Sequence, residues 1–225
     1  MLRCTFLGNC GFFLENETDA ILVDCPNGFH YAYDRLAEEE YARILNRCGR
    51  YDKLRGLFFT HLHDDHYDAE RTAELIENDR ELVLFAPDAN TEKSGAIQAG
   101  SFTVRYFKIP HSGENLRDVP HWVLMVETEG KQVFVTGDSE WTEPHLIELV
   151  AMYRPDCGIF NPNFVSHEEG RQLMAKIPEN YIYHYPVNRE DAYGIARKCR
   201  SRFVKHADEL RNVHLVDELP YVAEI

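Results

Sequence analysis

Apolar residues along this chain fall into short runs and into helical spacings, and the two patterns together predict a mixture of strands and helices. Turn-forming residues at Gly8-Asn9 and Asn16–Asp19 separate the first runs and predict strands in meander order. Glu129-Gly130 predicts a hairpin turn further along. The predicted strands are Arg3–Leu7, Gly11–Glu15, Ala20–Asp24, Gly56–Phe59, Glu81–Ala86, Phe102–Ile109, Trp122–Glu127, Gln132–Thr136, Cys157–Phe160 and Tyr181–His184.

Apolar residues that recur every three or four positions predict helices between these strands. The first helix carries apolar residues from Tyr33 to Cys48, and the second runs from about Asp68 to Asn78. A third begins at Thr142-Glu143-Pro144, and Ser166-His167-Glu168-Glu169 predicts a capping box for a fourth. The last helix is expected to bury Ala192, Ile195, Ala196, Cys199, Phe203 and Ala207.

The predicted strands form two groups, and helices follow each group. This order predicts an α+β fold in which two sheets pack together with helices outside, with an internal pseudo-repeat. A chain of 225 residues without an obvious linker is expected to form one domain over residues 1–225.

The net charge of the chain limits the kinds of binding partner that we expect. There are 24 basic and 38 acidic residues, a formal net charge of −14, which repels a nucleic-acid backbone. A small-molecule substrate is expected instead, and an anionic one remains acceptable because bound dications reverse the local charge. A homo-oligomer is left open.

The sequence shows no targeting signal, and this determines the cellular compartment that we expect. No stretch approaches the roughly 18 apolar residues that span a bilayer, so no membrane association is expected. The N-terminus lacks the cleavage pattern of a signal peptide and is interpreted as a strand. The six scattered cysteines are therefore expected to be thiols in a cytoplasmic protein, with Cys25, beside Asp24, as the one of functional interest.

The densest set of potential metal ligands follows the strand Gly56–Phe59, in His61-Leu62-His63-Asp64-Asp65-His66. Three imidazoles and a carboxylate at H-x-H-x-D-H spacing are the mixed nitrogen and oxygen donors that zinc, manganese or iron prefer. The motif therefore predicts a metal site where this strand ends.

Other candidate ligands also stand at the ends of predicted strands. They are His111, Asp138 and His184, and Gly137 lets the backbone pack close to a crowded site. Two further histidines are weaker candidates for the third imidazole ligand. His121 begins a strand and His145 lies in the first turn of a helix, so His111 is preferred.

The combined pattern resembles the metallo-β-lactamase superfamily, and the resemblance covers essentially the whole chain. It implies a four-layer αββα sandwich with a metal site at one edge of the two sheets. The pieces that carry it are Asp24 in Ile21–Asp24, the motif His61–His66, His111 in Pro110–Gly113, Asp138 in Thr136–Asp138, and His184.

The resemblance also implies a role for each of these residues. His61, His63 and His111 would bind one metal ion, and Asp65, His66 and His184 would bind a second. Asp138 would bridge the two ions, and Asp24 would orient a ligand or the histidine loop. The implied cofactor is a pair of divalent ions, with zinc favoured over manganese or iron.

The function implied is that of a dinuclear hydrolase in which a metal-bridging hydroxide attacks the substrate. A phosphodiester or related phosphoryl ester is favoured, by analogy with the small phosphodiesterase-like members of the superfamily. Asp65 is the candidate that accepts or relays a proton for the leaving group. Ser112, Tyr183 and Tyr185 flank the ligands and could contact substrate, although packing is the simpler interpretation.

Three alternatives remain. The same site could hydrolyse a carbonyl substrate such as a lactone or thioester, it could be a mononuclear iron oxygenase of the persulfide dioxygenase type, or it could bind metal without turnover. Metal identity and stoichiometry separate these functions. The basic segment Arg189–Lys205 is interpreted as the solvated face of the last helix.

Overall fold

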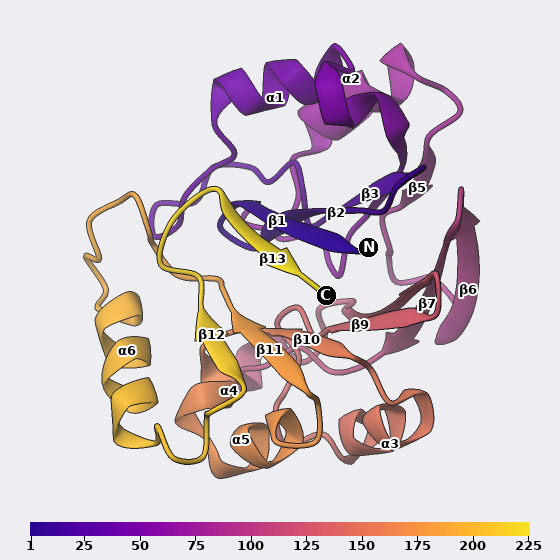
Figure 1. The fold of residues 1–225 in the computed structure, drawn as a ribbon. Coiled ribbons are helices and arrows are strands. Elements are labelled where there is room, and N and C mark those ends of the chain that lie inside the picture. The colour runs from indigo at the N-terminus through magenta and orange to yellow at the C-terminus, as the bar shows by residue number, and fades with distance from the viewer.

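A computed structural model describes residues 1–225, and in it two sheets face each other while helices cover their outer sides (Figure 1). Two helices cover the first sheet: α1 (Glu38–Leu45) and α2 (Ala69–Asn78). Four cover the second: α3 (Pro144–Tyr153), α4 (Asn163–Ser166), α5 (Glu168–Met174) and α6 (Ile195–Lys205). The predicted four-layer αββα arrangement is confirmed.

Each sheet is antiparallel on one side and parallel on the other. The first has the order β13 (Tyr221–Glu224), β1 (Arg3–Gly8), β2 (Gly11–Glu15), β3 (Ala20–Val23), β4 (Leu54–Phe58) and β5 (Val83–Phe85). The second has the order β12 (Val213–Leu215), β11 (Glu179–Ile182), β10 (Cys157–Phe160), β9 (Lys131–Val135), β8 (Trp122–Thr128), β7 (Phe102–Lys108) and β6 (Ser94–Ala99).

Parallel pairing positions most of the loops that contain the candidate metal ligands. It joins β3, β4 and β5 in the first sheet and β9 through β12 in the second. Carboxyl ends of parallel strands share one edge of a sheet, so the loops that follow them come together there. The chain also contains two short 3₁₀ helices, at Gly49–Lys53 and Glu114–Leu116.

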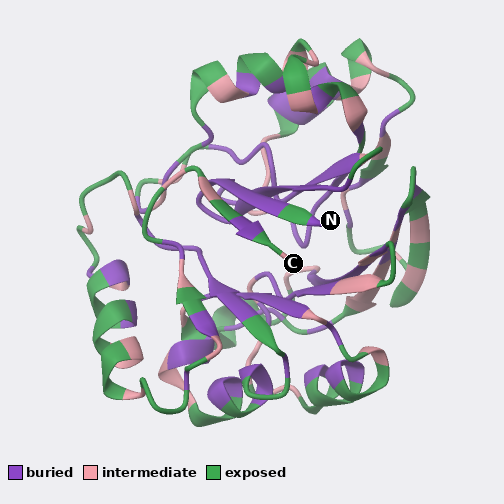
Figure 2. Cartoon of the chain, viewed as in Figure 1, coloured by how far each residue is buried: buried purple, intermediate pink, exposed green.

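Hydrophobic burial holds the layers together, because the central strands are covered on both faces (Figure 2). Every residue of β2, β3 and β10 is buried. The core between the sheets contains large side chains such as Phe6, Phe12 and Trp122, and separate cores lie beneath the helices on each side. No helix is long and apolar enough to cross a bilayer.

Most predicted elements are found within a few residues of their expected ends. The hairpin at Glu129-Gly130 is confirmed, and both residues have positive φ angles, of 50° and 76°. Asp68 begins α2, where its carboxylate accepts a hydrogen bond from the backbone of Arg71. This is the N-cap arrangement that such a residue favours.

Three helix predictions were wrong in detail because tertiary contacts outweigh local spacing. The first helix begins only at Glu38, since Tyr33 and its neighbours form a loop over the site. The capping box is absent, because the Ser166 hydroxyl donates to the carbonyl of Pro162 instead, 3.4 Å away. The last helix is shorter than predicted at both ends, so Ala192 and Ala207 lie outside it and are exposed rather than buried.

Three strands were missed. β6 contains glycine and alternates small and polar residues, so it lacks the apolar run that marks a strand. β12 and β13 are short and lie at sheet edges. They are defined by their partners, since β13 pairs with β1 from the opposite end of the chain.

We predict that Gly170→Ala destabilises the protein by about 1–3 kcal/mol. A Cβ atom at Gly170 would lie 2.4 Å from the backbone oxygen of Phe164, a contact between α5 and α4 that a flexible side chain cannot relieve. Urea unfolding measures the change. Glu169→Ala, on the exposed side of the same helix, serves as the control and should change stability by less than about 0.5 kcal/mol. Equal stability of the two variants would contradict this packing argument.

Candidate metal centre

Loops that follow four strands bring all seven predicted ligands to one edge of the sandwich. The H-x-H-x-D-H loop follows β4, whereas the other candidates come from the second sheet. His111 follows β7, Asp138 follows β9 and His184 follows β11. The seven side chains form two groups, in each of which the potential ligand atoms lie within 4.8 Å of one another.

The first group consists of three imidazoles: His61, His63 and His111. The Nε2 atom of His61 lies 3.1 Å from Nδ1 of His63, and the ring centroids of His63 and His111 are 5.0 Å apart. His61 and His111 are buried, while His63 is half-buried. Three imidazoles facing one point form a donor set that suits a borderline cation.

The second group combines two imidazoles with two carboxylates: Asp65, His66, Asp138 and His184. His184 lies between the carboxylates, with Nδ1 2.9 Å from Asp138 Oδ1 and Nε2 3.0 Å from Asp65 Oδ2. The Nε2 atom of His66 is 3.9 Å from Asp65 Oδ2. This group therefore carries more negative charge than the first and offers oxygen as well as nitrogen donors.

Asp138 connects the two groups. Its Oδ2 atom lies 3.6 Å from His66 Nε2 of the second group and 3.8 Å from His111 Nε2 of the first. Both of these nitrogens are buried without a hydrogen-bond partner. Buried polar atoms are nearly always satisfied, so two orphaned nitrogens that face one carboxylate fit a site for cations.

In His66 and His111 the hydrogen bond made by Nδ1 explains why Nε2 has an available lone pair. The Nδ1 atom of His66 lies 3.0 Å from Asp24 Oδ2, and that of His111 lies 2.7 Å from the carbonyl of Ser112. In each ring an Nδ1–H donor leaves the lone pair on Nε2. The Nδ1 atom of His61 likewise has a partner, the Thr60 hydroxyl at 3.1 Å, whereas its Nε2 atom faces Nδ1 of His63.

Asp24 holds the histidine loop in place. Its carboxylate is fully buried and accepts hydrogen bonds from the Thr60 backbone N–H at 2.7 Å and the Thr60 hydroxyl at 2.8 Å, besides its contact with His66. Asp24 has a positive φ angle of 47°, a sparsely populated conformation for this residue type. The same carboxylate thus joins the ends of β3 and β4 and orients an imidazole.

His121 is buried beside the two groups, but both of its ring nitrogens are hydrogen-bonded to the backbone. Its Nδ1 atom lies 3.0 Å from the carbonyl of Ile109, and its Nε2 atom accepts the backbone N–H of Asp138 at 3.0 Å. His121 therefore positions the Asp138 loop. A Cβ atom at Gly137 would lie 2.7 Å from Thr60 Oγ1 and 2.8 Å from His121 Nε2, which explains the glycine.

Several other candidates lie away from the ligand cluster or are used in packing. His145 is exposed on α3 and contacts Glu148. Tyr183 and Tyr185 are buried in the two cores of the second sheet rather than exposed to substrate. Ser112 contributes its backbone, which donates to the carbonyl of Asp138.

The cysteine beside the centre is Cys10 and not Cys25. The Cys10 thiol donates to the backbone carbonyl of Asp65 at 3.0 Å, and it lies among the potential ligand atoms of Asp24 and His66. Cys25 is buried beneath α1 in the core of the first sheet. Cys10 was missed because it lies 55 residues from the loop that it contacts.

Burial favours the neutral forms of His61 and His63 in the first group. It lowers the pKa of His61 and of His63, and the neighbouring imidazoles lower both further. Burial and the adjacent His111 also lower the pKa of His121, to about 3. Neutral imidazoles are the form that binds metal ions.

Charge pairing dominates the second group. Burial alone would lower the pKa of His184, but Asp138 and Asp65 raise it to about 10. Burial also opposes ionisation of both carboxylates, yet the imidazoles of His184 and His66 hold the pKa of each well below its usual range. Positive charge is therefore favoured between these carboxylates.

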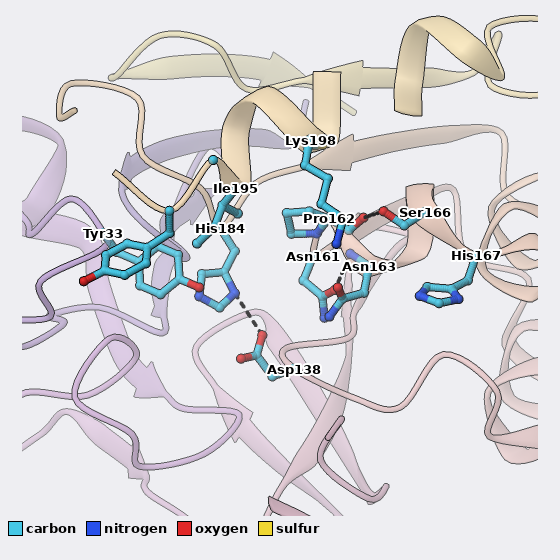
Figure 3. Close-up of a pocket in the computed structure, with 13 residues that line it drawn as sticks. Tyr33, Asp138, Asn161, Pro162, Asn163, Ser166, His167, His184, Ile195 and Lys198 are labelled. Atoms are coloured by element: carbon cyan, nitrogen blue, oxygen red, sulfur yellow. Dashed lines mark hydrogen bonds and ion pairs between the residues drawn. The ribbon is translucent and has the colours of Figure 1, made fainter. Parts of the chain in front are cut away.

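A cavity of about 350 Å³ opens beside the second group (Figure 3). Asp138 and His184 line one end, and Tyr33 stands against His184 with ring centroids 4.4 Å apart. The Tyr33 loop is tied to the segment after β11, since Asp34 accepts the backbone N–H of Val187 at 2.6 Å. The rest of the cavity is formed by the segments around α4 and the start of α6.

No protein-family model matches the chain, and no curated protein matches it in sequence. Solved structures match its fold. The metallo-beta-lactamase fold protein YhfI from Bacillus subtilis is 16% identical, with a TM-score of 0.68 over 100% of this chain and 99% of YhfI. A possible metal-dependent hydrolase from Veillonella parvula is 14% identical, with a TM-score of 0.69 over 100% of both chains.

CmlA, a diiron beta-hydroxylase from Streptomyces venezuelae, has the same architecture in part of its length. It is 14% identical, with a TM-score of 0.64 over 100% of this chain and 54% of CmlA. Together these likenesses show that the chain has the metallo-β-lactamase fold, as the sequence motifs indicated.

We predict that Thr60→Val destabilises the protein by about 1.5–3 kcal/mol, because it leaves a fully buried carboxylate oxygen of Asp24 without its hydroxyl donor. Valine keeps the shape of the side chain, so packing changes little. Thr60→Ser is the matched control and should retain most of the stability. Urea unfolding of the metal-free protein compares the two, and a Val variant as stable as the Ser variant would contradict this role of the hydroxyl.

Proposed function

We propose that this protein is a metal-dependent hydrolase with two divalent cations. In this proposal, His61, His63 and His111 bind one cation, and Asp65, His66 and His184 bind the other. Asp138 bridges the two cations, and Asp24 orients the ring of His66.

The observation that supports this proposal best is the position of Asp138. One carboxylate oxygen lies within 4 Å of an orphaned imidazole nitrogen from each group, 3.6 Å from His66 and 3.8 Å from His111. A shared carboxylate of this kind is what a two-metal site needs. Buried without cations, the same atoms would leave hydrogen-bonding capacity unused.

The donor set favours zinc, since imidazoles outnumber carboxylates. When bound, two such cations would supply a hydroxide at neutral pH and polarise the oxygen of an ester. The chain's own residues would fix the geometry. Hydrogen bonds from Thr60 to Asp24 hold the histidine loop, and the bond to His121 holds the loop of Asp138.

Asp65 is the residue that we propose moves a proton. Its Oδ2 atom faces His184 Nε2 at 3.0 Å, and its backbone carbonyl is fixed by Asn9 and Cys10. In this position, Oδ2 would accept the proton that the attacking hydroxide releases and pass it to the oxygen of the leaving group. The substrate that we propose is a phosphodiester or related phosphoryl ester, with a lactone or thioester as the carbonyl alternative.

Iron-dependent oxidation is a second candidate function. CmlA shares the fold, and its name assigns it a diiron centre. The present donor set of imidazoles and carboxylates is also compatible with iron, as one ion or two. Iron in the purified protein together with oxygen consumption would favour this candidate, whereas two zinc or manganese ions per chain would favour hydrolysis.

We predict that His63→Ala and Asp138→Ala each lower kcat for bis(p-nitrophenyl) phosphate by more than about 100-fold, because each removes a proposed ligand. Circular dichroism should show that both variants remain folded. His145→Ala is the control, since this histidine is exposed on α3 away from the centre. Activity at the wild-type level in the first two variants would refute the ligand assignment.

We predict that zinc stabilises the wild-type protein by about 2.7 kcal/mol when the free metal exceeds the dissociation constant 100-fold, because the metal binds only the folded chain. Chelation should reverse the effect. Asp138→Ala should gain much less, since both groups lose a ligand. Thermal unfolding with and without zinc, combined with metal analysis, measures this. A stability that does not respond to any divalent ion would count against the metal site.

A further inference from the structure

The cavity beside the metal centre contains a lysine that no acidic group neutralises. Lys198 lies on the first turns of α6 and lines the cavity that Asp138 and His184 close at its other end. Figure 3 shows its amine directed toward Asn161 and Asn163. Asp138 is the only carboxylate that lines this cavity, and it is already engaged by His184.

Two nearby arginines, Arg200 and Arg189, are held by other groups, and no arginine lines the cavity. Arg200, two residues further along α6, is bound to Asp217 with N–O distances of 3.0 and 2.8 Å. Arg189 donates to the backbone carbonyls of His30 and Tyr33. The Lys198 ammonium makes no ion pair with any carboxylate, in a chain whose net charge is −14.

Two polar side chains of the cavity, those of Asn163 and His167, have unused hydrogen-bonding capacity. Asn161 is occupied, because it donates to the carbonyl of Gly137 and accepts the backbone N–H of Asn163. The side chain of Asn163 has no such partner and is exposed at the cavity. The ring of His167 is stacked on Trp141 with centroids 4.0 Å apart, which fixes its orientation while its nitrogens stay free.

We propose that Lys198 is a specificity-determining residue that binds a second anionic group of the substrate. This inference rests on the proposed hydrolase function. The substrate class is then an ester with two anionic centres: one at the metal ligands, where the bond is cleaved, and one, a phosphate or a carboxylate, on the arm that occupies the cavity. Asn163 and His167 supply further hydrogen bonds to that arm.

The test compares binding of matched phosphonates to the zinc-loaded protein by isothermal titration calorimetry. Each pair has the same chain of two, three or four carbons and ends either in a methyl group or in a second anion. We expect the best anionic probe to bind at least about 10-fold more tightly than its methyl partner, the gain typical of one charge-assisted hydrogen bond. Carboxylate and phosphonate ends are compared to identify which anion the cavity prefers.

Variants of α6 assign the preference to Lys198. Lys198→Met should reduce the affinity ratio of anionic to methyl probe to near 1, and Lys198→Arg should retain much of it. Lys205→Met is the matched control, because Lys205 is also an exposed lysine of α6 but lies outside the cavity, so the ratio should be unchanged. Thermal unfolding checks that each variant is folded.

Equal affinity of anionic and methyl probes for the wild-type protein, including no detectable binding of either, would overturn the inference. A preference that survives Lys198→Met would overturn it too. Failure of the proposed function has a different signature, since metal content and hydrolysis of bis(p-nitrophenyl) phosphate are measured independently of this ratio. If the protein hydrolyses the phosphate but binds anionic and methyl probes equally, the proposed function stands and only the role of Lys198 is refuted.

Discussion

The buried carboxylate of Asp24 is the interaction on which the candidate centre depends. It accepts two hydrogen bonds from Thr60 and contacts Nδ1 of His66, so it joins two strand ends and sets one imidazole at once. A buried charge is costly unless it is fully hydrogen-bonded. Here the same bonds that offset this cost also fix the loop that carries His61 and His63, so stability and function share one set of atoms.

The electrostatic character of the site follows from which groups are adjacent. Imidazoles gather on one side, where burial lowers the pKa of His61 and His63, and carboxylates gather around His184, where they favour positive charge. Asp138 lies at the boundary between the two sides. The cavity then extends the site away from the ligands toward Lys198, in a region whose other wall residues carry no negative charge.

Local sequence predicted the parts of the structure that depend on local chemistry. The H-x-H-x-D-H loop and the strand-end positions of His111, Asp138 and His184 singled out seven residues that the structure brings together in two groups. What the sequence could not indicate depends on contacts between distant segments. Cys10, His121 and β13 acquire their places from partners elsewhere in the chain. Lys198 was interpreted as an ordinary solvent-exposed helix residue, because the cavity that it lines is formed by segments far apart in the sequence.

One consequence follows from where the ligands originate. His61, His63, Asp65 and His66 belong to the first sheet, while His111, Asp138 and His184 belong to the second, and each group draws from both. Neither sheet supplies all the members of either group. Bound metal ions would therefore cross-link the two sheets at this edge. Any motion that separated the sheets there would disrupt both groups together.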